Sequence, residues 1–272
     1  MPAFRLIVDP QFAPKFSQYC GQFSTSEYSG LAVFKWQEDS INHSIEELKL
    51  EVIQAGHSCI YIEERPIDAV FFDMDSTAIA QETIVELAAC AGKSEEVHRI
   101  TEEAMAGKLN FTEALNERVA SLKGLPISIY EDVFKRLHIN PGLKEFSELA
   151  NSKGMSLYLV SGGFIPFAKK ISEALGFQAH HANHLDVKNE TLVGTVSGTI
   201  VDGEEKARFL EATCQAKSIS TNHTLVVGDG ANDLNMMAAG GIAIGYHPKP
   251  VLIEKTDGVI LNDHKVLMDI IN

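Results

Sequence analysis

The stretch Asp68-Ala-Val-Phe-Phe-Asp-Met-Asp-Ser-Thr77 decides the fold, because a short apolar run ends there in two aspartates one residue apart. The run, 69–72, is rich in β-branched and aromatic side chains, which predicts a buried parallel strand. Asp73 and Asp75 then fall at its carboxyl end, where open α/β sheets bind ligands. Two carboxylates this close repel each other unless a cation lies between them or each has its own task. Mg²⁺, which prefers oxygen ligands, is the expected cation.

Composition excludes several classes of partner. The chain has 272 residues and a formal net charge of −14, which disfavours nucleic acid and anionic membranes. An anionic substrate therefore needs local positive charge. No uncharged apolar run reaches the ~18 residues of a membrane helix, and the amino terminus lacks the features of a signal peptide. Four cysteines without Cys-x-x-Cys spacing suggest reduced thiols. We expect a soluble, cytoplasmic protein.

Residues 1–66 predict a small α+β extension that carries no chemical motif. Its expected elements are strands at 3–8, 31–36 and 58–63 and a helix at 41–55, followed by a linker at 63–66. Two roles remain open for it: a regulatory module that binds an amino acid, or an extension for packing or dimerisation. We favour the second.

The rest of the chain predicts an α/β core interrupted by helices. Residues 81–138 contain helical stretches with little strand signal, at 81–91, 94–106, 111–122 and 129–137. From Pro141 onward, strands alternate with helices, which indicates a doubly wound parallel sheet. We therefore assign 67–80 and 139–272 to the core and 81–138 to an inserted helical bundle. A hairpin is expected at 183–197, with its turn near Lys188-Asn-Glu190.

Three further stretches place polar groups near the aspartates. Ser161-Gly-Gly163 follows an apolar strand and precedes a helix, so it predicts an anion pocket at a helix amino terminus. Gly228-Asp-Gly-Ala-Asn-Asp233 also follows an apolar strand and places Asp229 at its end. Each stretch alone fits a turn or a helix cap, as does 73–77, and Lys206 alone fits a solvated helix lysine.

Together these stretches resemble the haloacid-dehalogenase-like (HAD) phosphohydrolases, which have a Rossmann-type core, and within them the sequence is similar to the phosphoserine phosphatases. The residues that carry the resemblance are Phe72-Asp-Met-Asp-Ser-Thr77, Gln81-Glu-Thr-Ile84, Gly107-Lys-Leu-Asn-Phe111, Arg118-Val119, Val160-Ser-Gly-Gly-Phe164 and Val227-Gly-Asp-Gly-Ala-Asn-Asp233. The resemblance covers about 68–265 and does not extend to 1–66.

The resemblance implies a role for each polar residue. Asp73 is expected to be the nucleophile, and Asp75 to be the acid and base. Asp73, Asp229 and the backbone carbonyl of Asp75 are expected to bind Mg²⁺, with Asp233 orienting them. The residues implied to hold the phosphoryl oxygens are Lys206, Ser161, the Gly162 N–H and Asn232.

The resemblance also implies that the helical insert is a cap that selects the substrate. Glu82 and Arg118 match positions that bind the ammonium and carboxylate of an amino acid, and Met105 with Phe111 would form an apolar lid. The expected reaction releases L-serine and phosphate from O-phospho-L-serine.

Three alternatives were weighed against this reaction. A phosphotransferase of the same fold could pass the phosphoryl group to an alcohol such as homoserine. A mutase is disfavoured because Gly is expected where Ser76 stands. A silent sensor is disfavoured because every catalytic position holds a competent residue. His180, His181 and His184 lack a fourth ligand, which disfavours a metal site there. The sequence leaves a homodimer open.

Overall fold

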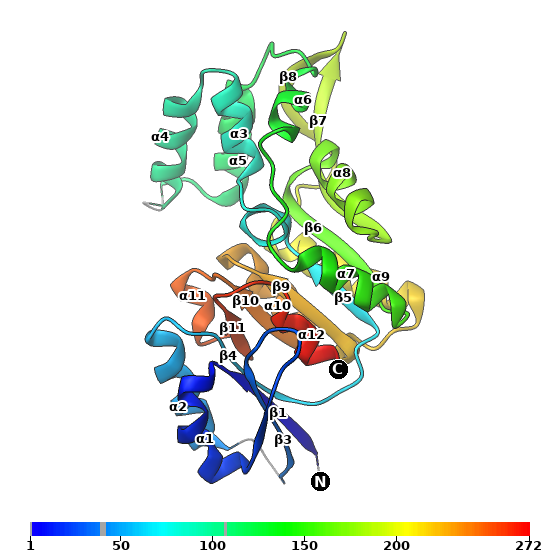
Figure 1. Cartoon of the computed structure of the whole chain (residues 1–272). Coiled ribbons are helices and arrows are strands. Elements are labelled where there is room, and N and C mark those ends of the chain that lie inside the picture. Colours follow the sequence, from blue (N-terminus) through cyan, green and yellow to red (C-terminus); the bar gives the residue numbers. More distant parts are fainter. Residues whose placement is uncertain (1, 39–41, 106–107) are drawn as a thin grey trace.

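The computed structural model describes residues 2–38, 42–105 and 108–272 (Figure 1). Within them the strands form one 11-stranded sheet, in the order β2-β3-β1-β4-β11-β10-β9-β5-β6-β7-β8. From β11 to β7 all neighbours run parallel. The parallel strands are β5 (Ala69–Phe72), β6 (Ser156–Phe164), β7 (Ala179–Lys188), β9 (Thr224–Gly228), β10 (Ile242–Tyr246) and β11 (Gly258–Ile260). The predicted α/β class is confirmed.

Helices cover both faces of the parallel strands, which explains why β5 is apolar throughout. Val70 and Phe72 belong to one core cluster with residues of α7 (Leu143–Ser152), α8 (Ile165–Leu175) and α12 (Val266–Ile271). Ala69 and Phe71 point the other way and share a second cluster with α9 and α10. The remaining helices of the core are α9 (Gly203–Lys217), α10 (Leu234–Ala239) and α11 (Pro250–Ile253).

The amino-terminal extension continues the core sheet. β4 pairs with β11, so that Ile60 lies opposite Gly258. A Cβ on Gly258 would lie 2.6 Å from the Ile60 Cα, so only glycine allows this approach. The elements of the extension are β1 (Ala3–Val8), α1 (Ala13–Cys20), β2 (Phe23–Thr25), β3 (Ala32–Gln37), α2 (His43–Gln54) and β4 (Cys59–Glu63). Of these, α1 and β2 were not predicted.

The helical insert lies above the carboxyl ends of the parallel strands (Figure 1). Its helices are α3 (Thr83–Cys90), α4 (Ser94–Met105), α5 (Phe111–Ser121) and α6 (Ile129–Phe134). The chain enters and leaves it side by side, since Ile79 and Ile139 form an antiparallel bridge. α5 begins with a capping box, in which Asn110 and Glu113 exchange hydrogen bonds. The division at 66, 80 and 139 stays a prediction.

The sequence predicted a hairpin at β7 and a helix after β6. The predicted hairpin forms between β7 and β8 (Thr191–Ser197), and its turn residues Asn189 and Glu190 take φ angles of 52° and 57°. The predicted helix after Ser161-Gly-Gly163 is confirmed as α8, which begins at Ile165, directly after β6 ends at Phe164. The pairing of β6 with β7 shifts register after Val160 and resumes at Phe164, so the two glycines lie in an irregular strand end. Among the described helices, none is long and apolar enough to cross a membrane.

His264 is a buried histidine that contacts β5 and the turn that follows it. Its ring stacks on Tyr246 with centroids 3.9 Å apart and meets Phe72 edge-on. Its Nε2–H donates to the Thr77 carbonyl at 2.9 Å, in the turn that carries the second aspartate. Burial lowers the pKa of His264 to about 4. The imidazole is therefore neutral in the folded protein at physiological pH.

This burial predicts a loss of stability in acid that His264→Phe should remove. The unfolded chain protonates this imidazole below its ordinary pKa of about 6.5, whereas the folded protein does so only near 4. Falling pH therefore favours unfolding of the unsubstituted protein, by about 2 kcal/mol at pH 5 relative to the variant. Urea unfolding of both proteins at pH 7, 6 and 5 measures this change. If the difference in free energy of unfolding between the two proteins did not vary with pH, the low pKa of His264 would be contradicted.

Candidate active site

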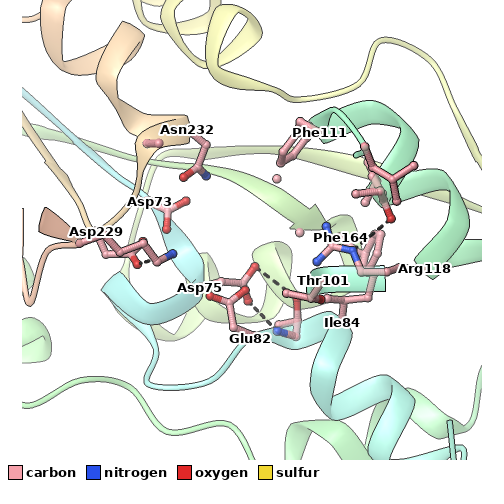
Figure 2. Close-up of a pocket in the computed structure, with 18 residues that line it drawn as sticks. Asp73, Asp75, Glu82, Ile84, Thr101, Phe111, Arg118, Phe164, Asp229 and Asn232 are labelled. Carbon is pink, nitrogen blue, oxygen red and sulfur yellow. Dashed lines mark hydrogen bonds and ion pairs between the residues drawn. The ribbon is translucent and has the colours of Figure 1, made fainter. Parts of the chain in front are cut away.

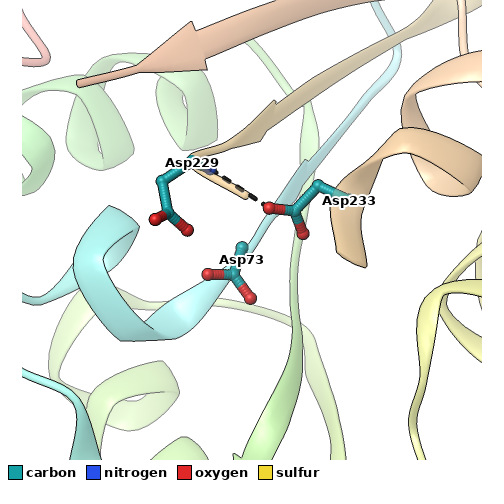
Figure 3. A group of neighbouring side chains, drawn as sticks. All are labelled: Asp73, Asp229 and Asp233. Carbon is teal, nitrogen blue, oxygen red and sulfur yellow. Dashed lines mark hydrogen bonds between the residues drawn. The ribbon is translucent and has the colours of Figure 1, made fainter. Parts of the chain in front are cut away.

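Three buried aspartates converge at the carboxyl ends of β5 and β9 (Figure 3). Asp73 directly follows β5 and Asp229 directly follows β9, and the strands pair in parallel at Phe72 and Val227. The register that the strands impose therefore sets the two carboxylates side by side. With Asp233 they offer oxygens that all lie within 4.8 Å of one another.

Lys206 neutralises part of this cluster from below. Its Nζ, fully buried on α9, donates to Asp73 Oδ1 at 2.5 Å and to Asp233 Oδ1 at 2.7 Å. The other oxygen of Asp233 accepts the N–H groups of Asp229 and Gly230. Burial alone would lower the pKa of Lys206, but the two aspartates outweigh it and raise that pKa above its usual range.

The balance of charge in this cluster suits a divalent cation. Three carboxylates face the single buried ammonium, and burial raises the pKa of Asp73 well above its usual range although Lys206 opposes this. The carboxylates therefore outnumber the buried ammonium, and the charged form of Asp73 stays unfavourable until a further cation offsets it. Carboxylate oxygens are the ligands that Mg²⁺ prefers, so the donor set fits the expected ion.

Asp75 lies on the turn Met74–Ala78, which follows β5. Its Oδ1 accepts the Thr83 N–H at 2.8 Å, and its Oδ2 accepts the hydroxyls of Thr83 and Ser161 at 3.3 and 3.4 Å. Burial, with a further contribution from Glu82, raises the pKa of Asp75 to about 7. A carboxyl group that keeps its proton near neutral pH can act as a proton donor. A Cβ on Gly163 would lie 2.5 Å from Asp75 Oδ2, which explains the glycine.

The aspartates open into a cavity of about 430 Å³ between the sheet and the insert (Figure 2). The core contributes the predicted residues Asp73, Asp75, Gly162, Asp229 and Asn232 to its lining. The insert contributes the predicted residues Glu82, Phe111 and Arg118. One cavity therefore contains the aspartates of the core together with a carboxylate and a guanidinium of the insert. Phe111 closes over the strand end, because a Cβ on Gly162 would lie 3.0 Å from its ring.

The remaining predicted residues lie deeper or outside the described part. Ser161 is fully buried, and its hydroxyl both accepts the Gly163 N–H at 2.8 Å and reaches Asp75. Lys206 and Asp233 are also fully buried, where Lys206 hydrogen-bonds to both Asp73 and Asp233. The side chain of Met105 lies outside the described residues. His181 pairs with Glu205 at 3.1 Å and stacks on Phe209, and the metal-binding group found among the described residues contains no histidine.

Sequence reasoning missed several residues of the cavity lining, of which Thr83 and Lys249 contact the aspartates. Thr83, which holds Asp75, directly follows Glu82 in a quoted motif, so its position was a usable signal. Lys249 lies in the loop after β10, and its Nζ is 3.2 Å from Asp229 Oδ2. A single lysine between two prolines gave no signal. Lys249 adds positive charge at the entrance, which a substrate dianion needs in a chain of this net charge.

Comparison with known proteins places this site in a family. Residues 70–238 match the family of haloacid dehalogenase-like hydrolases. The chain belongs to this family. It is 38% identical over 226 residues to a phosphoserine phosphatase of Archaeoglobus fulgidus, covering 83% of this chain and 65% of the relative. It is 41% identical over 194 residues to a phosphoserine phosphatase of Methanocaldococcus jannaschii, covering 71% of this chain and 92% of the relative.

A solved structure of the family matches the whole chain. A HAD family hydrolase from Salmonella enterica serovar Typhi superposes with a TM-score of 0.88 at 25% identity, over 100% of this chain and 99% of the other. Because this match covers the whole chain, it includes the amino-terminal extension. The match to the Methanocaldococcus relative covers only 71% of the chain. The chain therefore carries the hydrolase fold of its family with this extension attached.

The two lysines of the site predict losses of stability of different size. Lys206→Met leaves two buried carboxylates without their counter-ion and should lower the free energy of unfolding of the metal-free protein by about 3 kcal/mol. Lys249→Met is the matched control: its side chain is 62% exposed, so the cost should stay below about 1 kcal/mol. Urea unfolding in EDTA measures both. Equal losses would contradict the role given to burial.

Proposed function

We propose that the chain is a Mg²⁺-dependent phosphoserine phosphatase, which converts O-phospho-L-serine and water to L-serine and phosphate. One observation carries this proposal: the cavity joins a phosphotransfer set, Asp73, Asp75 and Asp229, to an anion and a cation on the insert, Glu82 and Arg118. The names of the two relatives support the same substrate.

The charges of the site explain how its residues would share the reaction. Asp73 attacks phosphorus, and the bond from phosphorus to the serine oxygen breaks as Asp75 gives that oxygen a proton. Asp75, now a carboxylate, takes a proton from water as the water oxygen attacks the aspartyl-phosphate, which releases phosphate and restores Asp73. Lys206, Ser161, the Gly162 N–H and Asn232 are proposed to hold the phosphoryl oxygens.

A divalent metal belongs to the proposal as the partner of the carboxylates. Asp73, Asp229 and the backbone carbonyl of Asp75 would hold Mg²⁺, which offsets the repulsion between the phosphate dianion and the nucleophile. Asp233 already binds Lys206 and two backbone N–H groups, which supports an orienting role for it.

The insert supplies the proposed choice of substrate. Arg118 is half-buried on α5 and donates through Nε to the Ala114 carbonyl at 3.1 Å. Among the described residues its terminal nitrogens have no hydrogen-bond partner, so they can bind a carboxylate. Glu82 lies beside Asp75 (Figure 2) and offers a carboxylate to an ammonium group. Phe111, and by prediction Met105, would exclude water above them.

A phosphotransferase with an acceptor such as homoserine is the second candidate, because the same carboxylates would serve it. Competition between water and added alcohols for the phosphoryl group separates the two. A cytoplasmic location also belongs to the proposal, supported by four free cysteines. A homodimer stays a prediction, as do the absence of nucleic-acid and membrane partners and the role of the extension.

The metal predicts a defined response to chelation. EDTA should remove activity and lower the melting temperature, and added Mg²⁺ should restore both. Excess Ca²⁺ should inhibit, because it prefers more ligands and would bind both oxygens of Asp73. Phosphate release and thermal melts across an ion series measure this. Full activity in Ca²⁺ alone, or in EDTA, would contradict the proposal.

The charges on the insert predict a loss that depends on the substrate. Glu82→Ala or Arg118→Ala should each lower kcat/KM for phosphoserine on the order of 10- to 150-fold, because a charged hydrogen bond is lost. Arg118→Lys should also be impaired, since an ammonium cannot grip a carboxylate with two parallel hydrogen bonds.

An aryl phosphate without either group serves as the control for these variants. The fall in its kcat/KM should be much smaller, because the aspartates and Lys206 are not altered. Equal losses on both substrates would mean that Glu82 and Arg118 support the site as a whole. No loss on either would favour another small phosphate ester as substrate.

A further inference from the structure

Ser76 has a backbone conformation that its residue type does not favour. It lies in the turn Met74–Ala78 with φ 60° and ψ −1°, the left-handed region. Glycine adopts this region freely, whereas a residue with a Cβ does so at a cost. Since glycine would relieve the strain, the contact that the serine side chain makes calls for an explanation.

The serine side chain contacts one of the residues proposed to recognise the substrate. Its Oγ–H donates to Glu82 Oε1 at 2.9 Å, and its N–H donates to the Gln81 carbonyl at 3.3 Å. Among the described residues, the Glu82 side chain makes no other hydrogen bond. Glu82 is exposed and sits at the start of α3 without capping the helix through its side chain.

We propose that Ser76 is a positioning residue that fixes the Glu82 carboxylate toward the cavity, where it meets the ammonium group of an amino-acid phosphate. A long exposed side chain loses rotamer freedom when it binds, and a hydrogen bond that holds it beforehand reduces that loss. Ser76 need not touch the substrate for this effect. The inference rests on the proposed function and names the residue that prepares its ammonium site.

The position of Ser76 explains why one turn can serve both chemistry and selection. Ser76 directly follows the proposed acid, Asp75, and hydrogen-bonds to Glu82. The next residue after Glu82, Thr83, hydrogen-bonds to Asp75. The hydroxyl thus ties the ammonium site to the same short segment that carries the acid. The alternative is that the hydroxyl only closes the turn, and substrates that differ in one group distinguish the two.

The test uses three phosphate esters of primary alcohols. Phosphoserine carries both an ammonium and a carboxylate, 2-aminoethyl phosphate lacks the carboxylate, and the phosphate ester of 3-hydroxypropanoate lacks the ammonium. Ser76→Gly should lower the kcat/KM ratio of phosphoserine to the ammonium-free ester about fivefold, mainly through KM, as expected for a partly exposed hydrogen bond. The 2-aminoethyl ester should follow phosphoserine.

Two further variants keep the test independent of folding and of the proposed function. Ser76→Ala also lacks the hydroxyl and should change the ratio as Ser76→Gly does, although Ser76→Gly should melt at the higher temperature because only glycine relieves the strain. In a Glu82→Gln background, Ser76→Gly should leave the ratio where Glu82→Gln has set it.

The outcomes separate this inference from the function on which it rests. Equal losses on all three esters after Ser76→Gly, with Glu82→Gln still selective against the ammonium, would overturn the positioning role alone. If Glu82→Gln leaves the ratio unchanged, the proposed recognition of an amino acid fails, and the inference fails with it.

Discussion

The hydrogen bonds of Lys206 with Asp73 and Asp233 are the interaction on which the site depends. All three side chains are buried, so water cannot compensate their charges. Without the ammonium, the parallel strands would press carboxylates together at the edge of the sheet. With it, the cluster retains a net negative charge that a divalent cation can offset. Because burial raises the pKa of Asp73, a bound cation would be needed to keep this proposed nucleophile charged in a dry site.

In the proposed function, a different part of the chain selects the substrate. The strand ends supply groups that any phosphate ester would need, whereas Glu82, Phe111 and Arg118 reach the same cavity from the insert. The antiparallel bridge between Ile79 and Ile139 joins the two chain segments that connect the insert to the core. An insert that changes its side chains can thus change the substrate without disturbing the buried carboxylates.

The sequence was sufficient for the parallel core because its signals are local. Apolar runs that end in Asp73 and Asp229 predicted both strands and the edge where they meet, and the structure places them there. It was insufficient for two short elements: β2 has three residues, all exposed, and α1 has eight residues with a proline in its first turn. The two glycines after Ser161 fitted a turn, whereas β6 extends irregularly past them and pairs with β7 again at Phe164. Lys249 could not be found, because only the folded loop brings it to Asp229.

The most direct test of the account is to trap the phosphoryl group on the enzyme. Asp75→Asn should still be phosphorylated by an aryl phosphate, whose leaving group needs no proton, and should then stall because an amide cannot activate water. Acid quenching and mass spectrometry of the peptides should find the phosphoryl group on Asp73. Its appearance on another residue, or a first turnover that leaves no phosphorylated enzyme, would contradict the account.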